Sequence, residues 1–259
     1  MKLSIITINL NNKVGLQKTI DSVVAQTYKD FEWIIIDGGS ADGSRELIEK
    51  YADNISYWIS EPDRGIYNAM NKGIRLSHGE YLHFLNSGDF FFDKNVLSNV
   101  APLLAGKDYY VGNEIRNERL IKQKLSTPQQ ICNTMITSCI FHQTTFINRR
   151  IFDIYGLYCE DKKMVSDWWL FYKSIIFGGA TVEKLPFTID IYDTNGISAN
   201  YRSDALAEEQ SLLSELPRAK FLIDFYRYNY DIVHALKSNR LVFFIFRIYF
   251  WLYRKYSKK

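Results

Sequence analysis

Acidic and amide side chains follow three short apolar runs in the first third of the chain. Asp37 follows WIII, Asp63 follows YWIS with Glu61 between them, and Asp89 follows YLHFL with Asn86 between them. If these runs are parallel strands, their carboxyl ends share one edge of a sheet, where open α/β proteins bind ligands. We therefore expect these side chains to line a single site.

Such a site suits a phosphate ligand that is held by a divalent cation. Helix N-termini at the same edge favour anions, so carboxylates there would repel a phosphate unless a cation bridged the two. Mg²⁺ and Mn²⁺ take oxygen ligands, commonly one or two carboxylates together with substrate phosphates. The alternative is that each carboxylate caps the helix that follows it. The chain has neither a G-x-G-x-x-G nor a P-loop motif, so those two kinds of phosphate site are not indicated.

Four apolar runs that alternate with helical patterns supply the elements that would position this site. Near-continuous apolar strands separated by amphipathic helices are typical of a parallel sheet covered on both faces. The sequence therefore predicts an α/β fold of Rossmann type, with a mostly parallel sheet flanked by helices. The expected strands are Leu3–Ile8, Trp33–Ile36, Ile55–Ile59 and Tyr81–Leu85, and the expected helices are Val14–Gln26, Ser44–Tyr51 and Tyr67–Leu76.

Beyond residue 100 the pattern is less regular. Residues 108–124 favour short mixed strands, so we expect the sheet to continue with at least one irregular or antiparallel element. Met164–Phe177 is rich in aromatic residues and predicts a helix. Because internal repeats and low-complexity linkers are absent, we expect one catalytic domain over residues 1–216, followed by a helical tail over residues 217–259.

Composition narrows the class of protein. The 32 basic and 29 acidic residues nearly cancel to a formal net charge of +3, which gives no reason to expect a nucleic-acid partner. The three cysteines are odd in number and lack C-x-x-C spacing, so neither a disulfide framework nor a thiolate metal site is indicated. The first apolar run is too short for a signal peptide, and no segment reaches the ~20 apolar residues of a spanning helix. A cytoplasmic protein is expected.

Several segments in fixed order carry a family resemblance. The chain resembles the inverting family 2 glycosyltransferases of the GT-A fold, of the bacterial polysaccharide and glycan biosynthesis type, in SIITINLNN, TIDSVVAQTYKDFEWIIIDGGSADGS, SEPDRGIYNAMNKGI and GEYLHFLNSGD. The match is close over residues 3–95 and looser through HQTTFINRRIFDIYGLY and MVSDWWLFYKSI to about residue 198. The resemblance implies transfer of a sugar from a nucleotide-diphosphate donor to a hydroxyl group of a glycan or lipid-linked acceptor.

The resemblance also implies a set of donor-binding residues. Asp37 matches the acidic position at which the family binds the base and ribose, although many members carry a second acid where this chain has a glycine. Asp63 and Arg64 match the segment that approaches the base in related enzymes. Asn68 and Lys72 lie on the helix that follows, where Lys72 is alternatively part of a solvated face.

The segment Asn86-Ser87-Gly88-Asp89 stands where the family has its D-x-D-type acidic motif. Only the last acid is present, so the resemblance makes Asp89 the ligand of a divalent metal, Mn²⁺ or Mg²⁺. Asn86 would contribute a neutral oxygen or contact the donor ribose. Because one charged ligand is missing, we expect weaker metal binding than in relatives with the full motif.

Asp167, in the segment VSDWW, falls where relatives place the general base that accepts the proton of the acceptor hydroxyl. Its alternative role is to cap a helix, because it stands near the start of one. His142 lies in a segment that faces the active site in similar enzymes, where it would approach the metal or the diphosphate; alternatively it is structural. The NGIS segment at residues 195–198 is expected to close over the donor.

Residues 239–259 form the predicted end of the tail. Arg240, Arg247 and Arg254 recur every seven residues among apolar and aromatic side chains, so a helix here would carry one basic stripe. A basic stripe beside Trp, Phe and Leu is typical of a helix lying in a membrane surface, which would place the protein peripherally on the inner face of the plasma membrane. The alternative is a helix packed on the catalytic domain with its arginines turned to solvent.

Other functions stay open at this point. A nucleotidyltransferase also binds a nucleotide through acids and a metal, but its glycine-rich, arginine-containing N-terminal loop is missing here. The missing acid at Asn86 leaves room for a catalytically silent module that binds a nucleotide or a glycan. A membrane-associated scaffold with a vestigial sheet is the third alternative.

Overall fold

The computed structural model of the chain describes residues 2–194 and 202–214. The described residues through Glu209 belong to one compact unit. The predicted closing loop at residues 195–198 and the predicted tail at residues 217–259, with its membrane contact, lie outside the described residues. Among the described residues, no helix combines the length and the apolar character that crossing a membrane requires.

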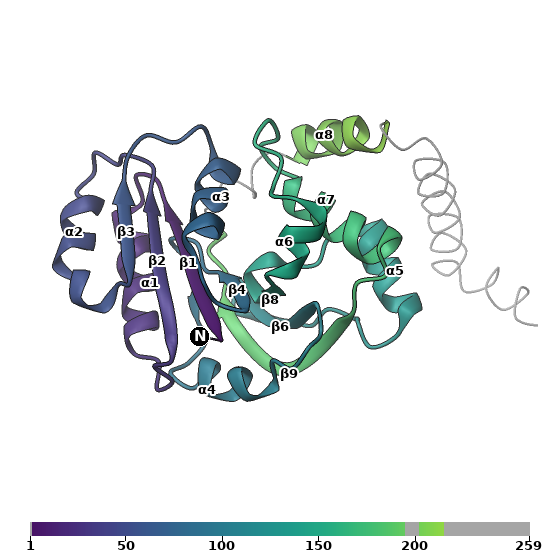
Figure 1. The fold of residues 1–259 in the computed structure, drawn as a ribbon, viewed down its shortest axis with the longest axis horizontal. Helices are drawn as coiled ribbons and strands as arrows, with labels where there is room; N and C mark the ends of the chain where they lie inside the picture. Colours follow the sequence, from purple (N-terminus) through teal and green to yellow (C-terminus); the bar gives the residue numbers. More distant parts are fainter. Residues whose placement is uncertain (1, 195–201, 215–259) are drawn as a thin grey trace, which may run out of the picture. The chain divides into compact units, whose positions relative to one another are not determined.

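The first four strands form the parallel half of the sheet, in the order β3-β2-β1-β4 (Figure 1). All seven residues of β1 are buried, as expected for a parallel strand that is covered on both faces. The four predicted strands are confirmed, although β3 begins two residues later than the sequence suggested. Their bounds are β1 Leu3–Asn9, β2 Phe31–Asp37, β3 Tyr57–Ser60 and β4 Tyr81–Phe84.

The second half of the sheet is mixed, as the less regular sequence beyond residue 100 predicted. β8 pairs antiparallel with both β4 and β6, while β9 pairs parallel with β6 and antiparallel with β5. The sheet is therefore parallel from β3 to β4 and mixed beyond β4. The strands of this half are β5 Phe90–Phe91, β6 Tyr109–Arg116, β7 Arg119–Ile121, β8 Thr145–Asn148 and β9 Val182–Ile191.

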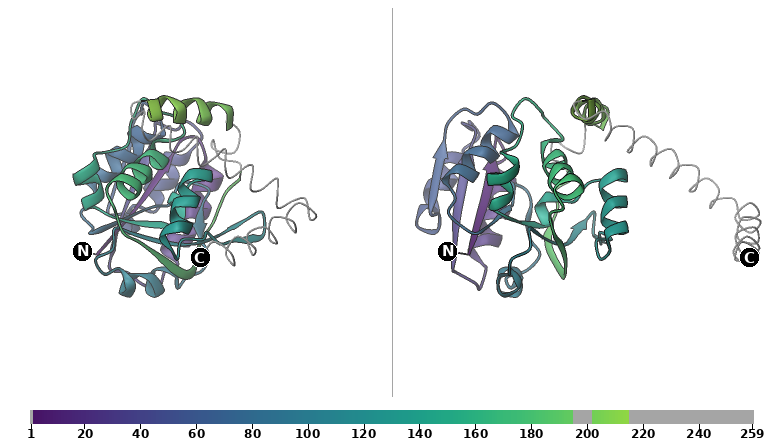
Figure 2. Two further views of the ribbon diagram at one scale, coloured as in Figure 1. Left: turned by 90° about the vertical axis from the view of Figure 1, so that its right-hand side faces the viewer. Right: turned by 45° about the vertical axis from the view of Figure 1, so that its right-hand side comes forward.

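Helices cover both faces of the parallel half (Figures 1 and 2). On one face, α1 (Lys13–Val24), α2 (Ser44–Lys50) and α4 (Val96–Val100) pack into a single apolar core with β1 and β2. On the other face lies α3 (Ile66–Leu76), in which Gly73 rests so closely on Ile6 of β1 that a Cβ atom would overlap its side chain. This close approach fixes α3 against the strands that lead to the site.

The remaining elements lie after β4. The predicted helix at 164–177 is observed as α7 followed by a π-helical stretch, η4, a feature that often occurs near functional sites. These elements are α5 Pro128–Thr137, α6 Arg150–Tyr155, α7 Ser166–Phe171, α8 Arg202–Ser214, η1 Ala52–Asn54, η2 Ala101–Leu103, η3 His142–Thr144 and η4 Tyr172–Phe177.

Candidate active site

The carboxyl ends of β1, β2 and β3 meet at one edge of the sheet because the strands run parallel. Asn9, Asp37 and Ser60 are the last residues of these strands and pair in register across them. The parallel register therefore brings the ends of these three strands together, with the predicted residue Asp37 between Asn9 and Ser60.

The loop after β1 ties this edge to the turn that follows β4. Asn11 donates its backbone N–H to Ser40 Oγ at 2.7 Å, and the side chain of Asn12 donates to the carbonyl oxygen of Ser87 at 3.1 Å. Asn11 has a φ of 48°, a left-handed conformation that asparagine tolerates better than most residues. The loops at the ends of β1, β2 and β4 therefore form one hydrogen-bonded unit.

Asp37 is fully buried, and its carboxylate accepts four hydrogen bonds from the protein. Asn9 Nδ2 and Ser40 Oγ donate to Oδ1 at 2.7 and 2.6 Å, while Ser40 N and Ser60 Oγ donate to Oδ2 at 3.0 and 2.6 Å. Burial acts to raise the pKa of Asp37, but the bonds from Ser40, Ser60 and Asn9 outweigh it and hold the pKa below its usual value. Asp37 thus shapes the edge of the site.

Replacing Asp37 by Asn should lower the free energy of unfolding by about 1–3 kcal/mol at pH 7, because the amide cannot accept from all four donors. The folded-state pKa lies below the ordinary value of 3.8, so this stabilisation is present above that pH and is lost as the pH falls through the folded pKa. Urea unfolding at pH 7 and in steps from pH 5 to 3 would measure it. Equal stability of the two proteins at pH 7 would contradict this role.

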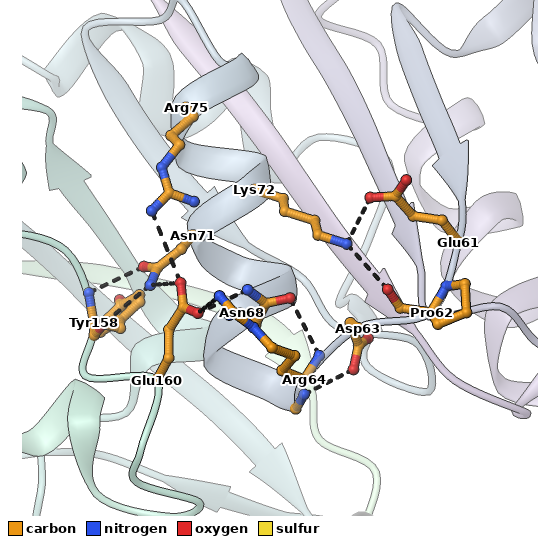
Figure 3. A network of polar contacts seen from close by, with 11 residues as sticks. Glu61, Pro62, Asp63, Arg64, Asn68, Asn71, Lys72, Arg75, Tyr158 and Glu160 are labelled. Atoms are coloured by element: carbon orange, nitrogen blue, oxygen red, sulfur yellow. Dashed lines mark hydrogen bonds and ion pairs between the residues drawn. The ribbon is translucent and has the colours of Figure 1, made fainter.

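Two of the predicted donor residues, Arg64 and Asn68, are turned toward Glu160 (Figure 3). Arg64 Nη2 and Asn68 Nδ2 donate to Glu160 Oε2 at 2.8 and 2.7 Å, and Asn71 Nδ2 donates to Oε1 at 3.0 Å. These bonds, led by the one from Asn71, hold the pKa of Glu160 below its usual value. Glu160 was not predicted from the sequence, and it fastens the segment that leads to Asp167 onto α3.

Lys72, the third predicted residue of α3, faces the loop that precedes its helix (Figure 3). Its Nζ lies 2.7 Å from Glu61 Oε1 and 3.4 Å from the carbonyl oxygen of Pro62. Asp63, in the same loop, accepts a hydrogen bond from the backbone N–H of Gly65 at 2.9 Å. Lys72 therefore braces this loop, so its side chain is not simply part of a solvated face.

Asp89 is 95% buried at the turn after β4, and its Oδ1 accepts the backbone N–H of Asp193 at 2.8 Å. Burial is the main cause that raises its pKa to about 7, and repulsion from Asp193 and Glu114 adds to it, while His142 acts in the opposite direction. The ionised form of Asp89 is therefore disfavoured by burial and by neighbouring acids.

Two further buried carboxylates lie close enough to Asp89 to interact with its charge. They are Glu114 on β6 and Asp190 on β9. They are register partners on adjacent strands, and both are fully buried. Arg116 Nε lies 2.8 Å from Glu114 Oε1, but no residue that the structure describes donates a hydrogen bond to either oxygen of Asp190. Burial, followed by repulsion from Asp89 and Glu114, raises the pKa of Asp190 well above its usual value. Neither acid was predicted from the sequence, because no local pattern indicates that β6 pairs with β9.

Asp167, in the first turn of α7, is held by two hydrogen-bond donors from different elements. Tyr67 Oη of α3 donates to Oδ1 at 2.8 Å, and His142 Nδ1 of η3 lies 3.1 Å from Oδ2. Burial acts to raise the pKa of Asp167, but the hydrogen bond and charge of His142 and the bond from Tyr67 outweigh it and lower the pKa. Each carboxylate oxygen keeps a second lone pair, so Asp167 can still accept a proton.

His142 connects Asp167 to the turn that carries Asp89. Its Nε2 lies 3.3 Å from Asn86 Nδ2, and Asn86 Oδ1 is buried with no partner among residues 2–194 and 202–214. Burial opposes protonation of His142, but the hydrogen bond and charge of Asp167, with Asp89 and Glu114, raise its pKa. If His142 is protonated, turning the Asn86 amide would pair Oδ1 with the second ring N–H.

The predicted residues thus fall into two groups with different surroundings. Asn86, His142 and Asp167 form one hydrogen-bonded series beside Asp89, which unites the predicted base with the predicted metal turn. The charged residues of the α3 segment are instead paired with Glu61 and Glu160. Tyr67 was not predicted as a site residue, although it directly precedes the predicted residue Asn68.

Comparison of sequences identifies the family. A family model described as Glycosyl transferase family 2 matches residues 4–152, which is more than half of the 259 residues. An uncharacterized glycosyltransferase of Mycobacterium tuberculosis is 43% identical over 106 residues, which cover 40% of this chain and 40% of that protein. A PGL/p-HBAD biosynthesis glycosyltransferase of Mycobacterium bovis is 29% identical over 171 residues, or 64% of this chain and 66% of that protein. The aligned part is thus about two fifths of the length of the first of these relatives.

Solved structures share the fold. S. aureus TarS 1-349 in complex with UDP-GlcNAc matches with a TM-score of 0.68 and 17% identity, covering 83% of this chain and 66% of TarS 1-349. The mannosyltransferase PcManGT from Pyrobaculum calidifontis, in complex with GDP-Man and Mn2+, matches with a TM-score of 0.60 and 14% identity, covering 86% of this chain and 69% of PcManGT. Since the family model spans the strands and turns that build this edge, and these neighbours share the sheet, the chain is a member of glycosyl transferase family 2 with the GT-A fold.

Proposed function

We propose that the chain transfers a sugar, with inversion, from a nucleotide-diphosphate sugar to a hydroxyl group of a glycan or lipid-linked acceptor. The observation that carries this proposal is the position of Asp167, buried and clamped by Tyr67 and His142 within one hydrogen-bonded series that reaches Asn86. A carboxylate that is kept ionised beside the donor turn suits proton acceptance from an incoming hydroxyl group.

In the proposed reaction Asp167 is the general base. It takes the proton of the acceptor hydroxyl while the acceptor oxygen bonds to the anomeric carbon on the face opposite the leaving group. The bond from that carbon to the diphosphate oxygen breaks, and its electron pair leaves with the nucleoside diphosphate. The hydrogen bonds from Tyr67 and His142 fix the carboxylate in place, so little reorganisation is needed as the proton moves.

A divalent cation, Mn²⁺ or Mg²⁺, fits the residues at the turn after β4. Among residues 2–194 and 202–214, no three His, Cys, Asp or Glu side chains are grouped as ligands of one ion, but these metals often use one or two carboxylates with substrate phosphates. Within the described part of the chain, the oxygens of Asp190 and Oδ1 of Asn86 accept no hydrogen bond, and burial raises the pKa of Asp89, so oxygen ligands for a cation are available here. Asp89 would hold the ion, which would neutralise charge developing on the leaving diphosphate.

The remaining donor contacts follow from the family resemblance and the neighbouring structures. To contact the donor, Arg64 and Asn68 would first have to release Glu160. Lys72 would likewise have to release Glu61. PcManGT, a fold neighbour, is found with GDP-Man and Mn2+, which supports a nucleotide sugar and a metal here. The membrane contact proposed for residues 239–259 would serve a lipid-linked acceptor.

The experiment that tests this function measures nucleoside diphosphate release from a panel of sugar nucleotides, with Mn²⁺ or with EDTA. Slow transfer to water makes the assay possible before the acceptor is known. Metal-dependent release from one donor is expected. If no donor in the panel is bound or cleaved, the chain is a binding module of another kind and the proposal is wrong.

Replacing Tyr67 by Phe should lower kcat for this release by about tenfold, since one charge-assisted hydrogen bond to Asp167 is lost. Because the lost bond favours the ionised form, the pKa of Asp167 should rise, and the acid limb of the pH profile should move to higher pH.

The matched control for Tyr67→Phe is Tyr158→Phe. The centroid of the Tyr158 ring lies 5.5 Å from that of Tyr67, and its buried hydroxyl has no hydrogen-bond partner in the described residues. Its removal should leave kcat and the pH profile unchanged. An unshifted acid limb in the Tyr67 variant would show that Tyr67 has only a packing role.

A further inference from the structure

Three segments meet beside Gly38, just beyond the ends of β1, β2 and β3. A Cβ atom on Gly38 would overlap Asp63 Oδ2 and would lie 3.1 Å from Leu10 Cδ1. Gly38 leaves this space to the carboxylate of Asp63, which comes from the loop after β3. The space beside Gly38, just after β2, is therefore filled by a charged group from the loop after β3.

The Asp63 carboxylate is oriented and yet available for a ligand. Its Oδ1 accepts the backbone N–H of Gly65 at 2.9 Å, which sets the plane of the group (Figure 3). Its Oδ2 has no donor among residues 2–194 and 202–214, and Oδ1 keeps one further lone pair. Two adjacent acceptor positions are thus presented at the edge of the site.

An exposed apolar side chain lies next to this acceptor. Leu10 is 54% exposed although it follows a fully buried strand. Its loop is held in place, because Asn11 bonds to Ser40 and Ser40 in turn bonds to Asp37. A rigid apolar surface beside a charged acceptor suits a flat ring that has donors along one edge and an apolar face.

We propose that Asp63 recognises the nucleobase of the donor and selects guanine, so that the substrate is a guanosine diphosphate sugar. Guanine presents two adjacent donors, a ring N–H and an amino group, which match the two oxygens of a carboxylate. Uracil presents one ring N–H between two carbonyl oxygens, which the second carboxylate oxygen repels. Cytosine and adenine place a ring lone pair beside their amino group, with the same result.

This inference rests on the proposed function, because it assumes that a nucleotide binds at this edge. The variant Asp63→Asn separates the two claims. Asparagine can still accept the Gly65 N–H through its oxygen, so the loop is preserved, but its amide group places a donor against the donors of guanine. The matched control is Asp53→Asn, an exposed aspartate in η1, ten residues before Asp63.

Calorimetric titration with GDP, UDP, CDP and ADP in the presence of Mn²⁺ tests the inference. The wild type should bind GDP at least about tenfold more tightly than the other three, and Asp63→Asn should lose about tenfold to a hundredfold for GDP alone. The Asp53 variant should match the wild type.

Tighter binding of UDP, CDP or ADP than of GDP by the wild type would overturn the inference while leaving the transferase function intact. So would an unchanged GDP preference in Asp63→Asn. If the wild type binds none of the four nucleotides, the proposed function fails, and this inference fails with it.

Discussion

Asp167→Asn is expected to reduce kcat by about 10²–10⁴-fold, which is the usual contribution of a general base. The amide cannot take the acceptor proton. Because it has the size of the carboxylate, Tyr67 and His142 should keep their positions around it. Nucleotide binding should be unchanged, because Asp167 accepts the proton only in the transition state. Product release under saturating donor, together with a calorimetric Kd for the nucleotide, would measure both quantities.

A matched control for this variant is Asp161→Asn, six residues earlier in the same connection. Asp161 pairs with the neighbouring Lys162, and its side chain is 73% exposed, so solvent screens its charge. Its kcat should equal that of the wild type. Full activity of Asp167→Asn would remove this residue from the mechanism and leave it as a structural partner of Tyr67 and His142.

Asp89→Asn is expected to abolish metal-dependent activity and to stabilise the protein at the same time. The carboxylate is the proposed ligand of the cation, and a neutral amide binds Mn²⁺ or Mg²⁺ weakly. It is also buried near Glu114 and Asp190, so its charge is costly when no metal is present. If Asp89 were needed only for folding, its replacement by Asn would lower the free energy of unfolding instead.

The gain in stability should depend on pH in a defined direction. The folded-state pKa of Asp89 is about 7, above the ordinary value of 3.8, so ionisation destabilises the fold increasingly from about pH 4 to 7 and fully above pH 7. In EDTA, the Tm of the variant should therefore be higher than that of the wild type at pH 8 and equal to it near pH 4. Each kcal/mol corresponds to about 2–4 °C in a protein of this size.

Asp93→Asn is the control for Asp89→Asn. Asp93 lies four residues further along, is exposed, and accepts the backbone N–H of Asn95 at 2.7 Å. This variant should keep its metal-dependent activity and show no gain in stability at pH 8. A variant at Asp89 that retains activity with Mn²⁺ would contradict the assignment of the metal ligand.

Local patterns were sufficient to predict the parallel half of the sheet. β1 and β2 are buried on both faces, and such strands have near-continuous apolar sequences that stand out between amphipathic helices. The polar residues at the strand ends then followed from topology, since parallel strands place their carboxyl ends together. Asp37 was found in this way, but its four hydrogen bonds depend on Asn9, Ser40 and Ser60, whose approach only the fold determines.

The other half of the site was less accessible to prediction. His142 was expected near the metal or diphosphate, and the structure pairs it with Asp167 and Asn86 through contacts across 25 and 56 residues of sequence. Asp190 and Glu114 become neighbours only because β9 inserts beside β6, and β9 carries no pattern that names its partner. Long-range pairing within mixed sheets is the information that local periodicity lacks.

The central claim is that Asp89, at the turn after β4, holds a cation against the diphosphate of a nucleotide sugar. A crystal structure with GDP and Mn²⁺ tests it most directly, because manganese is visible by its anomalous scattering. The account predicts an anomalous peak in contact with Asp89 and the diphosphate, with the base beside Leu10 and Asp63. A nucleotide bound away from the ends of β1, β2 and β4, or a manganese ion without contact to Asp89, would contradict it.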